Sequence, residues 1–221
     1  SCKQRCENLI ISLKVIGKLT GDDKLIFRHR DVIIQKQSVY TGITRYISDL
    51  SVDATDAVKA YTKSIIDWPS SQYLNVWVVT NCESGAGGYA YYPGASNAID
   101  GIIMPTNVFR NMAHEAGHWL SLAHPWGSTN EPNNGLNCDS DDGVDDTPNC
   151  DGSPSDCNIF RQTCDGDPDP FYSIDSVELW SGSEINDNVQ NYMDYGWCDA
   201  ENFTQGQKAR VHAALNSSLG N

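Results

Sequence analysis

Three histidines and a glutamate lie within one short stretch of the chain, His-Glu-Ala-Gly-His-Trp-Leu-Ser-Leu-Ala-His, which begins at residue 114. If residues 106–120 form a helix, His114 and His118 lie one turn apart on the same face, where their imidazoles can bind one metal ion. Glu115 lies beside the first histidine and could take a proton from a water molecule at the metal. These residue types at this spacing predict a catalytic metal centre.

The third histidine of the stretch, His124, is too far along to share a straight helix face with His118. The chain must therefore turn sharply near Ser121 to bring His124 back. Three protein ligands that leave a fourth position to water are typical of a catalytic zinc site. The alternative is an ordinary core helix, but three of the chain's five histidines at ligand spacing favour a metal site.

The elements that must position these residues can be predicted from periodicity and turn residues. Apolar residues at helical spacing predict a helix over 53–68, and a capping box at Thr204 starts another over 205–215. Runs that favour β-structure predict strands at 9–15, 24–28, 32–34, 73–80, 88–92 and 98–104. Strands that alternate with helices indicate a mixed α/β layer.

The histidine stretch resembles the motif HExxHxxGxxH of the metzincin metallopeptidases, in which a turn containing methionine follows further along the chain. Residues 191–195, here called the Met-turn, read Asn-Tyr-Met-Asp-Tyr and look like that turn. With Leu-Ala-His at 122–124 and Asp-Thr-Pro at 146–148, the sequence is most similar to the pappalysin family. The resemblance covers roughly residues 24–215.

The resemblance implies an α/β (α+β) fold of the metzincin type. Such a fold has a twisted mixed sheet with an antiparallel edge strand and two long helices, plus a loop-rich, disulfide-stapled C-terminal subdomain. We expect a single catalytic domain over 1–221. Its N-terminal subdomain, 1–124, would carry the sheet, the backing helix and the active-site helix. Its C-terminal subdomain, 125–221, would carry the acidic loop, the Met-turn and the C-terminal helix.

The resemblance also implies roles for single residues. Glu115 would act as general base and then pass its proton to the leaving amine. Met193 would form a hydrophobic base under the histidines, and Tyr195 would hydrogen-bond the tetrahedral intermediate. An ordinary core methionine and a buried core tyrosine are the alternatives. The implied zinc ligands are His114, His118 and His124.

One position departs from the family motif. Ser121 stands where the family has glycine, which is expected there because the helix must end in a left-handed conformation. A residue other than glycine costs about 1–2 kcal/mol in that conformation. We expect zinc binding to survive this cost, with an effect on the approach of His124 and on turnover.

The segment 125–169 is the most acidic part of the chain and suits a hard cation such as Ca²⁺. Its crowded carboxylates are Asp139, Asp141, Asp142, Asp145 and Asp146. Resemblance to calcium-binding pappalysins implies four ligands, Glu131, Asp142 and the backbone at Asp145 and Thr147. The alternative is a solvated acidic loop without a metal ion.

Eight cysteines, an even number with no Cys-x-x-Cys pair, predict disulfides and therefore export from the cell. A zinc site made by cysteines is the alternative, but the spacings are irregular. The resemblance implies the pairs Cys138 with Cys164 and Cys157 with Cys198. It leaves four cysteines unassigned, Cys2, Cys6, Cys82 and Cys150.

The net charge of −14, from 29 acidic and 15 basic side chains, argues against binding to nucleic acid or to anionic membrane surfaces. No apolar run approaches the length of a membrane span. Cationic protein or peptide substrates would be favoured, and we expect a monomer.

The function predicted from these observations is that of a secreted zinc endopeptidase. In the family, the strand at 88–92 is an edge strand above the cleft, and an extended substrate could pair with it at Gly88, Tyr89 and Ala90. An ordinary edge strand is the alternative. Asp199 or Glu201 could form the floor of the S1′ pocket and select a basic P1′ residue. Two other functions stay open, a degenerate protease domain that acts as a binding or adhesion module and a zinc hydrolase of a non-peptide substrate.

Overall fold

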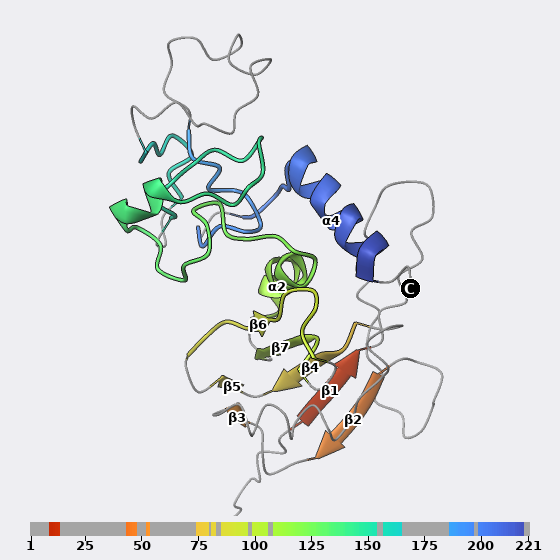
Figure 1. Ribbon diagram of the computed structural model, residues 1–221. Helices are drawn as coiled ribbons and strands as arrows, with labels where there is room; N and C mark the ends of the chain where they lie inside the picture. The colour runs from red at the N-terminus through yellow and green to blue at the C-terminus, as the bar shows by residue number, and fades with distance from the viewer. Residues whose placement is uncertain are drawn as a thin grey trace, which may run out of the picture. The chain divides into compact units, whose positions relative to one another are not determined.

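Five strands of the N-terminal half form a mixed sheet in the computed structural model (Figure 1). They are β1 (Leu9–Leu13), β2 (Ile43–Ile47), β4 (Val76–Val79), β6 (Tyr89–Ala90) and β7 (Ile102–Pro105). Their order is β2-β1-β4-β7-β6. β4 and β7 are parallel and the other neighbours are antiparallel. The mixed sheet with an antiparallel edge strand, β6, is confirmed.

The structure describes residues 9–13, 43–47, 52–53, 74–79, 81–82, 85–96, 99–105, 108–153, 157–164, 186–196 and 199–218. The chain divides into two compact units, Ser1–Met112 and Ala113–Asn221. We call them the first and the second unit. A single catalytic domain with a subdomain boundary at residue 124 stays a prediction.

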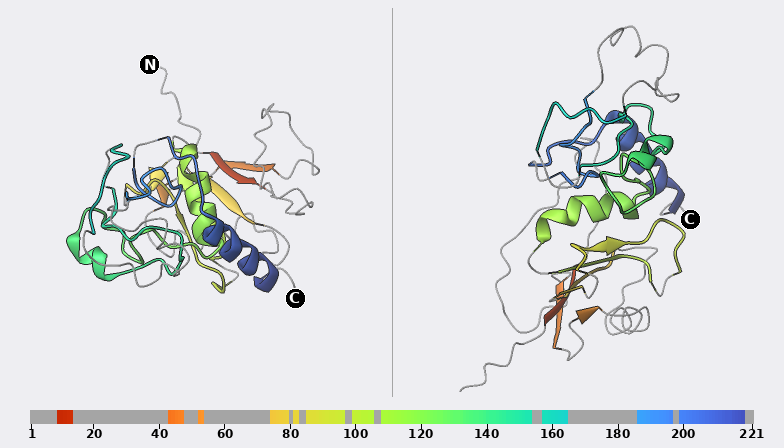
Figure 2. Two further views of the ribbon diagram at one scale, coloured as in Figure 1. Left: turned by 90° about the horizontal axis from the view of Figure 1, so that it is seen from above. Right: turned by 90° about the vertical axis from the view of Figure 1, so that its left-hand side faces the viewer.

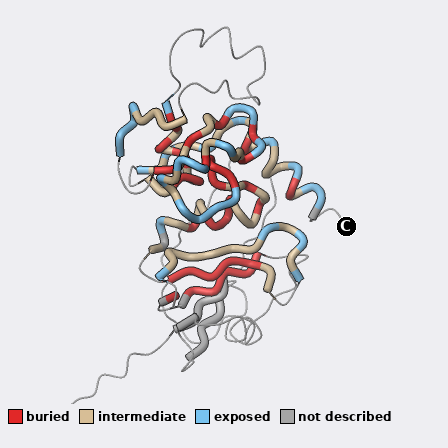
Figure 3. The backbone as a smooth tube through the Cα atoms, turned by 60° about the vertical axis from the view of Figure 1, so that its left-hand side comes forward, coloured by how far each residue is buried: buried red, intermediate tan, exposed pale blue. Residues whose placement is uncertain are grey.

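The core of the first unit is formed by the central strands β4 and β7, which are buried at residues 76–78 and 102–105 (Figure 3). Trp77 and Ile103 are fully buried and form a cluster with Cys82. Gly101 has φ +126°, and a Cβ there would lie 2.5 Å from the Asn75 carbonyl oxygen. Glycine therefore allows the chain to enter β7 close against β4.

The observed strands agree with the predicted runs where the structure describes them. β1, β4 and β6 lie inside the predicted runs 9–15, 73–80 and 88–92, and β7 extends one residue past 98–104. β2 was not predicted, nor was the short parallel pair of β3 (Val52–Asp53) and β5 (Asn81–Cys82). The predicted strands 24–28 and 32–34 lie outside the described residues, and so does the helix 53–68 except for Asp53, which belongs to β3.

The active-site helix is shorter than the predicted range 106–120. A 3-10 turn, η1 (Phe109–Asn111), comes first, and the α-helix α2 spans Met112–Trp119. Turns of the 3-10 type are frequent at helix N-termini. Here the Asn111 side chain donates to the Gly87 carbonyl at 3.2 Å, which holds this first turn in place. The histidines still fall in the regular part of the helix.

The regular structure described in the second unit consists of α2, the 3-10 helix η2 (Gly135–Asp139) and α4 (Gln205–Ser218), and the other described residues of this unit are irregular (Figure 2). α4 begins at the predicted residue because the predicted capping box is formed. Gln207 N–H donates to Thr204 Oγ1 at 3.1 Å, and Thr204 N–H donates to Gln207 Oε1 at 3.0 Å. The helix continues three residues beyond the predicted end at 215. Among the described residues, no helix is long and apolar enough to cross a membrane.

One predicted disulfide is confirmed and links η2 to the irregular segment that carries Cys164. Cys138 and Cys164 are bonded, with their Cα atoms 5.4 Å apart. Cys157 is also disulfide-bonded, while its predicted partner Cys198 lies outside the described residues, as do Cys2 and Cys6. Cys150 is a buried free thiol, and burial raises its pKa well above the usual value.

Candidate metal centre

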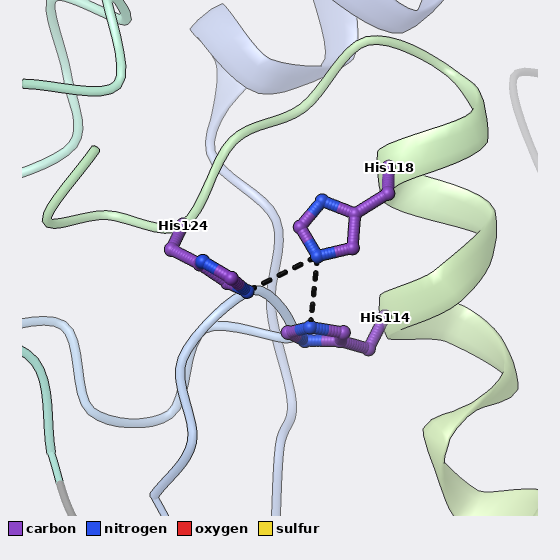
Figure 4. Close-up of side chains that lie close together, drawn as sticks. All are labelled: His114, His118 and His124. Atoms are coloured by element: carbon purple, nitrogen blue, oxygen red, sulfur yellow. Dashed lines mark hydrogen bonds between the residues drawn. The ribbon is translucent and has the colours of Figure 1, made fainter. Parts of the chain in front are cut away.

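The three imidazoles meet at their Nε2 atoms, two coming from α2 and one from the segment after it (Figure 4). His118 Nε2 lies 3.1 Å from His114 Nε2 and 3.1 Å from His124 Nε2. The ligand atoms of all three lie within 4.8 Å of one another, and among the described residues this is the group of histidine, cysteine or acidic side chains that could hold a metal ion. The structure thus brings the three predicted zinc ligands together.

Each imidazole is held from behind by a main-chain carbonyl that faces its Nδ1 atom. The pairs are His114 with Tyr192 O at 2.8 Å, His118 with Leu122 O at 2.8 Å, and His124 with Thr129 O at 2.9 Å. A carbonyl oxygen can only accept, so the proton of each neutral ring is on Nδ1. The lone pair of each ring is therefore on Nε2, which faces the centre of the group.

This arrangement fits a zinc ion. The lone pair of His118 faces those of His114 and His124 at 3.1 Å, and these lone pairs repel unless a cation lies between them. In a tetrahedral zinc site, two nitrogen ligands at the usual distance from the metal lie about 3.3 Å apart, close to the observed separation. Three neutral imidazoles and no thiolate are also a donor set that zinc prefers in catalytic sites.

Burial keeps the three imidazoles neutral. Desolvation, helped by the nearby His118, lowers the pKa of His114 to about 4. Desolvation together with the other two rings lowers the pKa of His124 to about 2, and desolvation lowers the pKa of His118 as well. Neutral imidazole is the form that binds a metal ion, so the ligands need lose no proton at neutral pH.

The turn between the second and third histidines is a helix-ending motif at Ser121. Leu122 N–H donates to Gly117 O at 2.9 Å and Ser121 N–H donates to His118 O at 3.0 Å, which is the Schellman pattern. Ser121 has φ +77°, so the left-handed conformation expected at this position is confirmed. Serine makes the turn that glycine makes in the family motif, and His124 reaches the other two ligands.

Met193 of the Met-turn packs directly on α2 at Gly117. The Met193 side chain has a relative exposure of 0%, and a Cβ added at Gly117 would lie 2.3 Å from its Sδ atom. Residue 117 must therefore be glycine because Met193 lies so close to the helix, and not because the backbone needs a special conformation there. Sequence reasoning missed Gly117, although an isolated glycine inside a predicted helix indicates a packing reason.

The Met-turn is tied to the first turn of α4 by two buried amides. Asn191 Oδ1 accepts from Met193 N–H at 2.9 Å, and Asn191 Nδ2 donates to Gln207 Oε1 at 2.9 Å. Gln207 also completes the capping box of α4. Because Tyr192 O of the same turn accepts from His114, the start of α4 helps to fix the first histidine.

Glu115 lies next to the first histidine on α2 and is 5% exposed. Burial raises its pKa to about 8. A divalent cation at the neighbouring histidines would act in the opposite sense and favour the carboxylate.

Two aromatic side chains enclose His124. The Trp126 ring stacks face to face on His124, with centroids 4.5 Å apart and an interplanar angle of 9°. The Tyr195 ring lies edge-on to His124 at 4.8 Å and 5.4 Å from His114. Tyr195 thus lies beside the histidines. Trp126 was missed, since a tryptophan two residues beyond the motif carries no specific signal.

The acidic loop buries two of its four predicted calcium ligands. Asp142 and Thr147 are 5% and 0% exposed, whereas Glu131 and Asp145 are exposed. Four buried oxygens of this loop have no hydrogen-bond partner, namely Asp141 Oδ1, Asp142 Oδ2, Thr147 Oγ1 and Asn149 Oδ1. Burial raises the pKa of Asp142 to about 7, outweighing the Val144 N–H that lowers it. Oxygens without donors are the groups that a hard cation binds.

The predicted substrate-binding residues lie in both units. Tyr89 and Ala90 form β6 in the first unit, and Gly88 directly precedes it. β6 is the last strand in the sheet order. Asp199, in the second unit, is exposed.

Two histidines on a helix and a third after its end, packed with a methionine turn in an α+β protein, define the metzincin class of fold. The sequence model of the Peptidase_M43 family, described as pregnancy-associated plasma protein-A, matches residues 57–216, and the chain belongs to this family. The resemblance to the pappalysins is thereby confirmed.

Curated relatives share part of this sequence. An extracellular metalloprotease of Pyricularia oryzae is 27% identical over 174 residues, which are 72% of this chain and 53% of the relative. An extracellular metalloprotease of Verticillium alfalfae is 30% identical over 159 residues, 63% of this chain and 48% of the relative. The chain therefore spans about half the length of these relatives.

Solved structures of mirolysin share the fold. Mirolysin in complex with compound 9 is similar with a TM-score of 0.61 at 24% identity, over 80% of this chain and 66% of that chain. Mature mirolysin of Tannerella forsythia, in complex with a cleaved peptide, has a TM-score of 0.53 at 25% identity, over 74% and 61%.

Proposed function

We propose that this chain is the catalytic part of a secreted zinc endopeptidase. The observation that carries the proposal is the convergence of three Nε2 atoms whose rings are fixed through Nδ1 on main-chain carbonyls. Membership of the Peptidase_M43 family supports it, and so do the relatives that are named extracellular metalloproteases.

Zinc held by His114, His118 and His124 would supply Lewis acidity, which lowers the pKa of water to about 7 and polarises the scissile carbonyl. Glu115 accepts the proton of the attacking water and returns it to the leaving amine. Its burial in α2 keeps the carboxyl group fixed and close to the first histidine.

Tyr195 donates its phenolic proton to the oxygen of the tetrahedral intermediate. Its ring packs edge-on against both the His124 ring and the Trp126 ring, at centroid distances of 4.8 Å and 5.1 Å. This packing limits the positions that the hydroxyl group can reach. Met193 contributes only shape, by filling the space beneath α2 at Gly117.

The substrate is an extended peptide that adds to the edge of β6. β6 pairs with β7 through Tyr89 opposite Ile103 and Ala90 opposite Ile102, and as the last strand of the sheet it can offer its outer edge to a peptide. The cleaved peptide bound to mirolysin is in keeping with a peptide ligand.

The chain's net charge of −14 favours cationic peptides, and the exposed carboxylate of Asp199 selects a basic P1′ residue. Fluorogenic peptides varied at P1′ test this preference, with Asp199→Asn as the variant and Glu201→Asn as its matched neighbour. Equal cleavage of Arg, Ala and Glu at P1′ would rule the preference out. We also propose that the protein acts as a monomer.

The acidic loop binds a structural calcium ion. The buried oxygens Asp142 Oδ2 and Thr147 Oγ1, which lack a hydrogen-bond donor, support this assignment. Calcium should raise the melting temperature of the EGTA-treated protein, and Asp142→Asn should abolish that rise. Asp145→Asn is the control, because only the backbone of Asp145 is proposed as a ligand. No calcium-dependent shift in the unaltered protein would contradict the assignment.

The test of the proposed function is cleavage of a denatured protein and of a fluorogenic peptide with a basic P1′ residue. Activity should disappear with a zinc chelator and return with added zinc. Glu115→Gln should lose activity by several orders of magnitude while it still binds zinc. A protein that binds one zinc ion per chain and cuts neither substrate would contradict the endopeptidase assignment and favour a binding module.

A further inference from the structure

His124 is the one proposed zinc ligand that no helix holds. His114 and His118 are anchored on α2, whereas His124 follows the Schellman turn in an irregular segment. An imidazole on an irregular segment needs other contacts to hold its orientation. Two almost completely buried side chains with no part in the proposed chemistry follow it in the chain, Trp126 on the same segment at 0% exposure and Asn137 in η2 at 2%.

Trp126 holds His124 in two ways at once. Its ring stacks on the imidazole at 4.5 Å with only 9° between the planes. Its Nε1–H donates to Thr129 O at 3.0 Å, and His124 Nδ1 donates to the same oxygen at 2.9 Å. A carbonyl oxygen has two lone pairs and can accept both bonds. The shared acceptor keeps the two rings parallel and directs His124 Nε2 toward the other histidines.

Thr129 itself needs support, because it is exposed and lies outside regular structure. Its hydroxyl donates to Asn137 Oδ1 at 3.1 Å. Asn137 Nδ2 donates in turn to Glu131 O at 2.8 Å and to Asp151 O at 2.9 Å. The Asn137 amide thus joins η2 to the segment 129–131 and to the segment at Asp151. The next residue, Cys138, is fixed by its disulfide.

We propose that Trp126 and Asn137 are positioning residues for the third zinc ligand. Trp126 acts on His124 directly, and Asn137 acts through the carbonyl of Thr129. This inference rests on the proposed zinc site and deepens it, because it identifies what sets the orientation of His124 in place of a helix. Groups that orient a metal-binding histidine typically change metal affinity by about 10–100-fold.

The test measures zinc affinity by competition with a chromogenic chelator, in parallel with the visible spectrum of the cobalt-loaded protein. Trp126→Leu removes both the stacking and the hydrogen bond and should weaken zinc binding about 10–100-fold. Trp126→Phe keeps an aromatic ring, loses only the bond to Thr129, and should weaken binding by less than about tenfold. Both variants should change the cobalt d–d bands, because the His124 ring can tilt.

Asn137→Asp tests the indirect contact without a change of shape. It replaces the amide donors by an oxygen that faces two carbonyls, and it should also weaken zinc binding. Trp126→Leu combined with Asn137→Asp should cost less than the sum of the two, because both act through Thr129.

Ala214→Gly is the control for lost stability. Ala214 is buried in α4, and glycine there costs about 1 kcal/mol of helix stability without contact to the proposed ligands. Its melting temperature should fall while its zinc affinity and cobalt spectrum stay unchanged. Equal zinc affinity in the control and in Trp126→Phe and Asn137→Asp would overturn the inference, even if Trp126→Leu did not fold. If the unaltered protein binds no zinc, the proposed function fails first.

Discussion

At the scale of single residues, each of the three histidines uses both of its ring nitrogens. Nε2 faces the centre and Nδ1 donates to a carbonyl, and the three carbonyls belong to separate segments, the Met-turn, the turn after α2 and the loop at Thr129. The centre is therefore sensitive to residues that never approach the metal, and Gly117 is one of them.

Gly117→Ala should destabilise the protein. The new Cβ would lie 2.3 Å from Met193 Sδ. Because α2 and the Met-turn must then separate, we expect a loss of about 1–3 kcal/mol in the free energy of unfolding, measured by urea denaturation, together with weaker zinc binding.

The matched control for this change is Gly135→Ala. A Cβ at Gly135 meets no atom within 4 Å, and this variant should stay within about 0.5 kcal/mol of the unaltered protein. The double variant Gly117→Ala/Met193→Ala should recover part of the loss, because the shorter side chain makes room. Equal stability of Gly117→Ala and Gly135→Ala would contradict the packing described.

The candidate ligands could be predicted from the sequence because one helical turn brings residues four apart onto one face. The acceptors of their Nδ1 protons could not be predicted. Tyr192 O and Thr129 O are main-chain atoms, so side-chain identity carries no trace of their use, and their positions depend on the folded path of irregular segments. Trp126 and Asn137 were missed because their contacts also depend on the folded path of these segments.

At the scale of elements, the end of α2 determines where the third histidine goes. The Schellman turn reverses the chain within three residues, and Ser121 takes the left-handed conformation that this reversal needs. In this conformation a serine is strained by a steric contact of its Cβ that glycine lacks. The helix end is therefore strained at Ser121.

Ser121→Gly should therefore stabilise the protein. The relief of left-handed strain exceeds the added flexibility of the unfolded chain, so we expect a gain of about 0.5–1 kcal/mol and a higher melting temperature. Ser128→Gly is the control, because Ser128 is exposed and does not have a positive φ. A melting temperature that falls equally in both variants would show that Ser121 is not strained.

The elements that could be predicted are those with a local signal. The capping box set the start of α4, and short apolar runs set β1, β4 and β7. β2 was missed because Ile43–Ile47 is neither a continuous apolar run nor a strict alternation of apolar and polar residues. The start of α2 was placed too early because the bond from Asn111 to Gly87 is not local in the sequence.

At the scale of the whole molecule, an acidic chain buries several carboxyl groups, and burial raises their pKa values. Asp194 is 8% exposed, and burial raises its pKa to about 7 despite N–H donors from Gly196 and Ser153. Burial likewise raises the pKa of Asp187 to about 6 and that of Asp142 to about 7. All three raised pKa values lower the stability of the folded protein as the pH rises.

Stability of the metal-free protein should fall as the pH rises from about 4 to about 7. Below the unfolded pKa of 3.8 both states hold the Asp194 proton, and no difference arises. Between that value and about 7 the unfolded state releases the proton and the folded state retains it, so folding is progressively opposed. Above about 7 the loss is complete and constant.

Asp194→Asn should flatten this dependence, measured as the free energy of unfolding in urea at pH 4.5 and 7.5 with chelator present. Asp199→Asn, at an exposed position, should leave the slope unchanged. An unchanged slope in Asp194→Asn would show that this carboxyl group is ionised in the folded protein.

The family, the mixed sheet and the disulfide between Cys138 and Cys164 could all be predicted from the sequence, because a dense motif and its flanking segments identify a fold. The burial of the acidic loop could not. Composition shows that charges are crowded, but not which oxygens the folded chain leaves without donors, such as Asp142 Oδ2 and Thr147 Oγ1.

The central claim is a zinc ion bound by three imidazoles. X-ray absorption at the zinc K-edge of the zinc-loaded protein tests it most directly. The structure predicts three histidine nitrogens and one further light atom at about 2.0–2.1 Å, with the multiple-scattering pattern of imidazole. His124→Ala should reduce the imidazole count from three to two. A sulfur shell at about 2.3 Å, or fewer than three imidazoles in the unaltered protein, would contradict the claim.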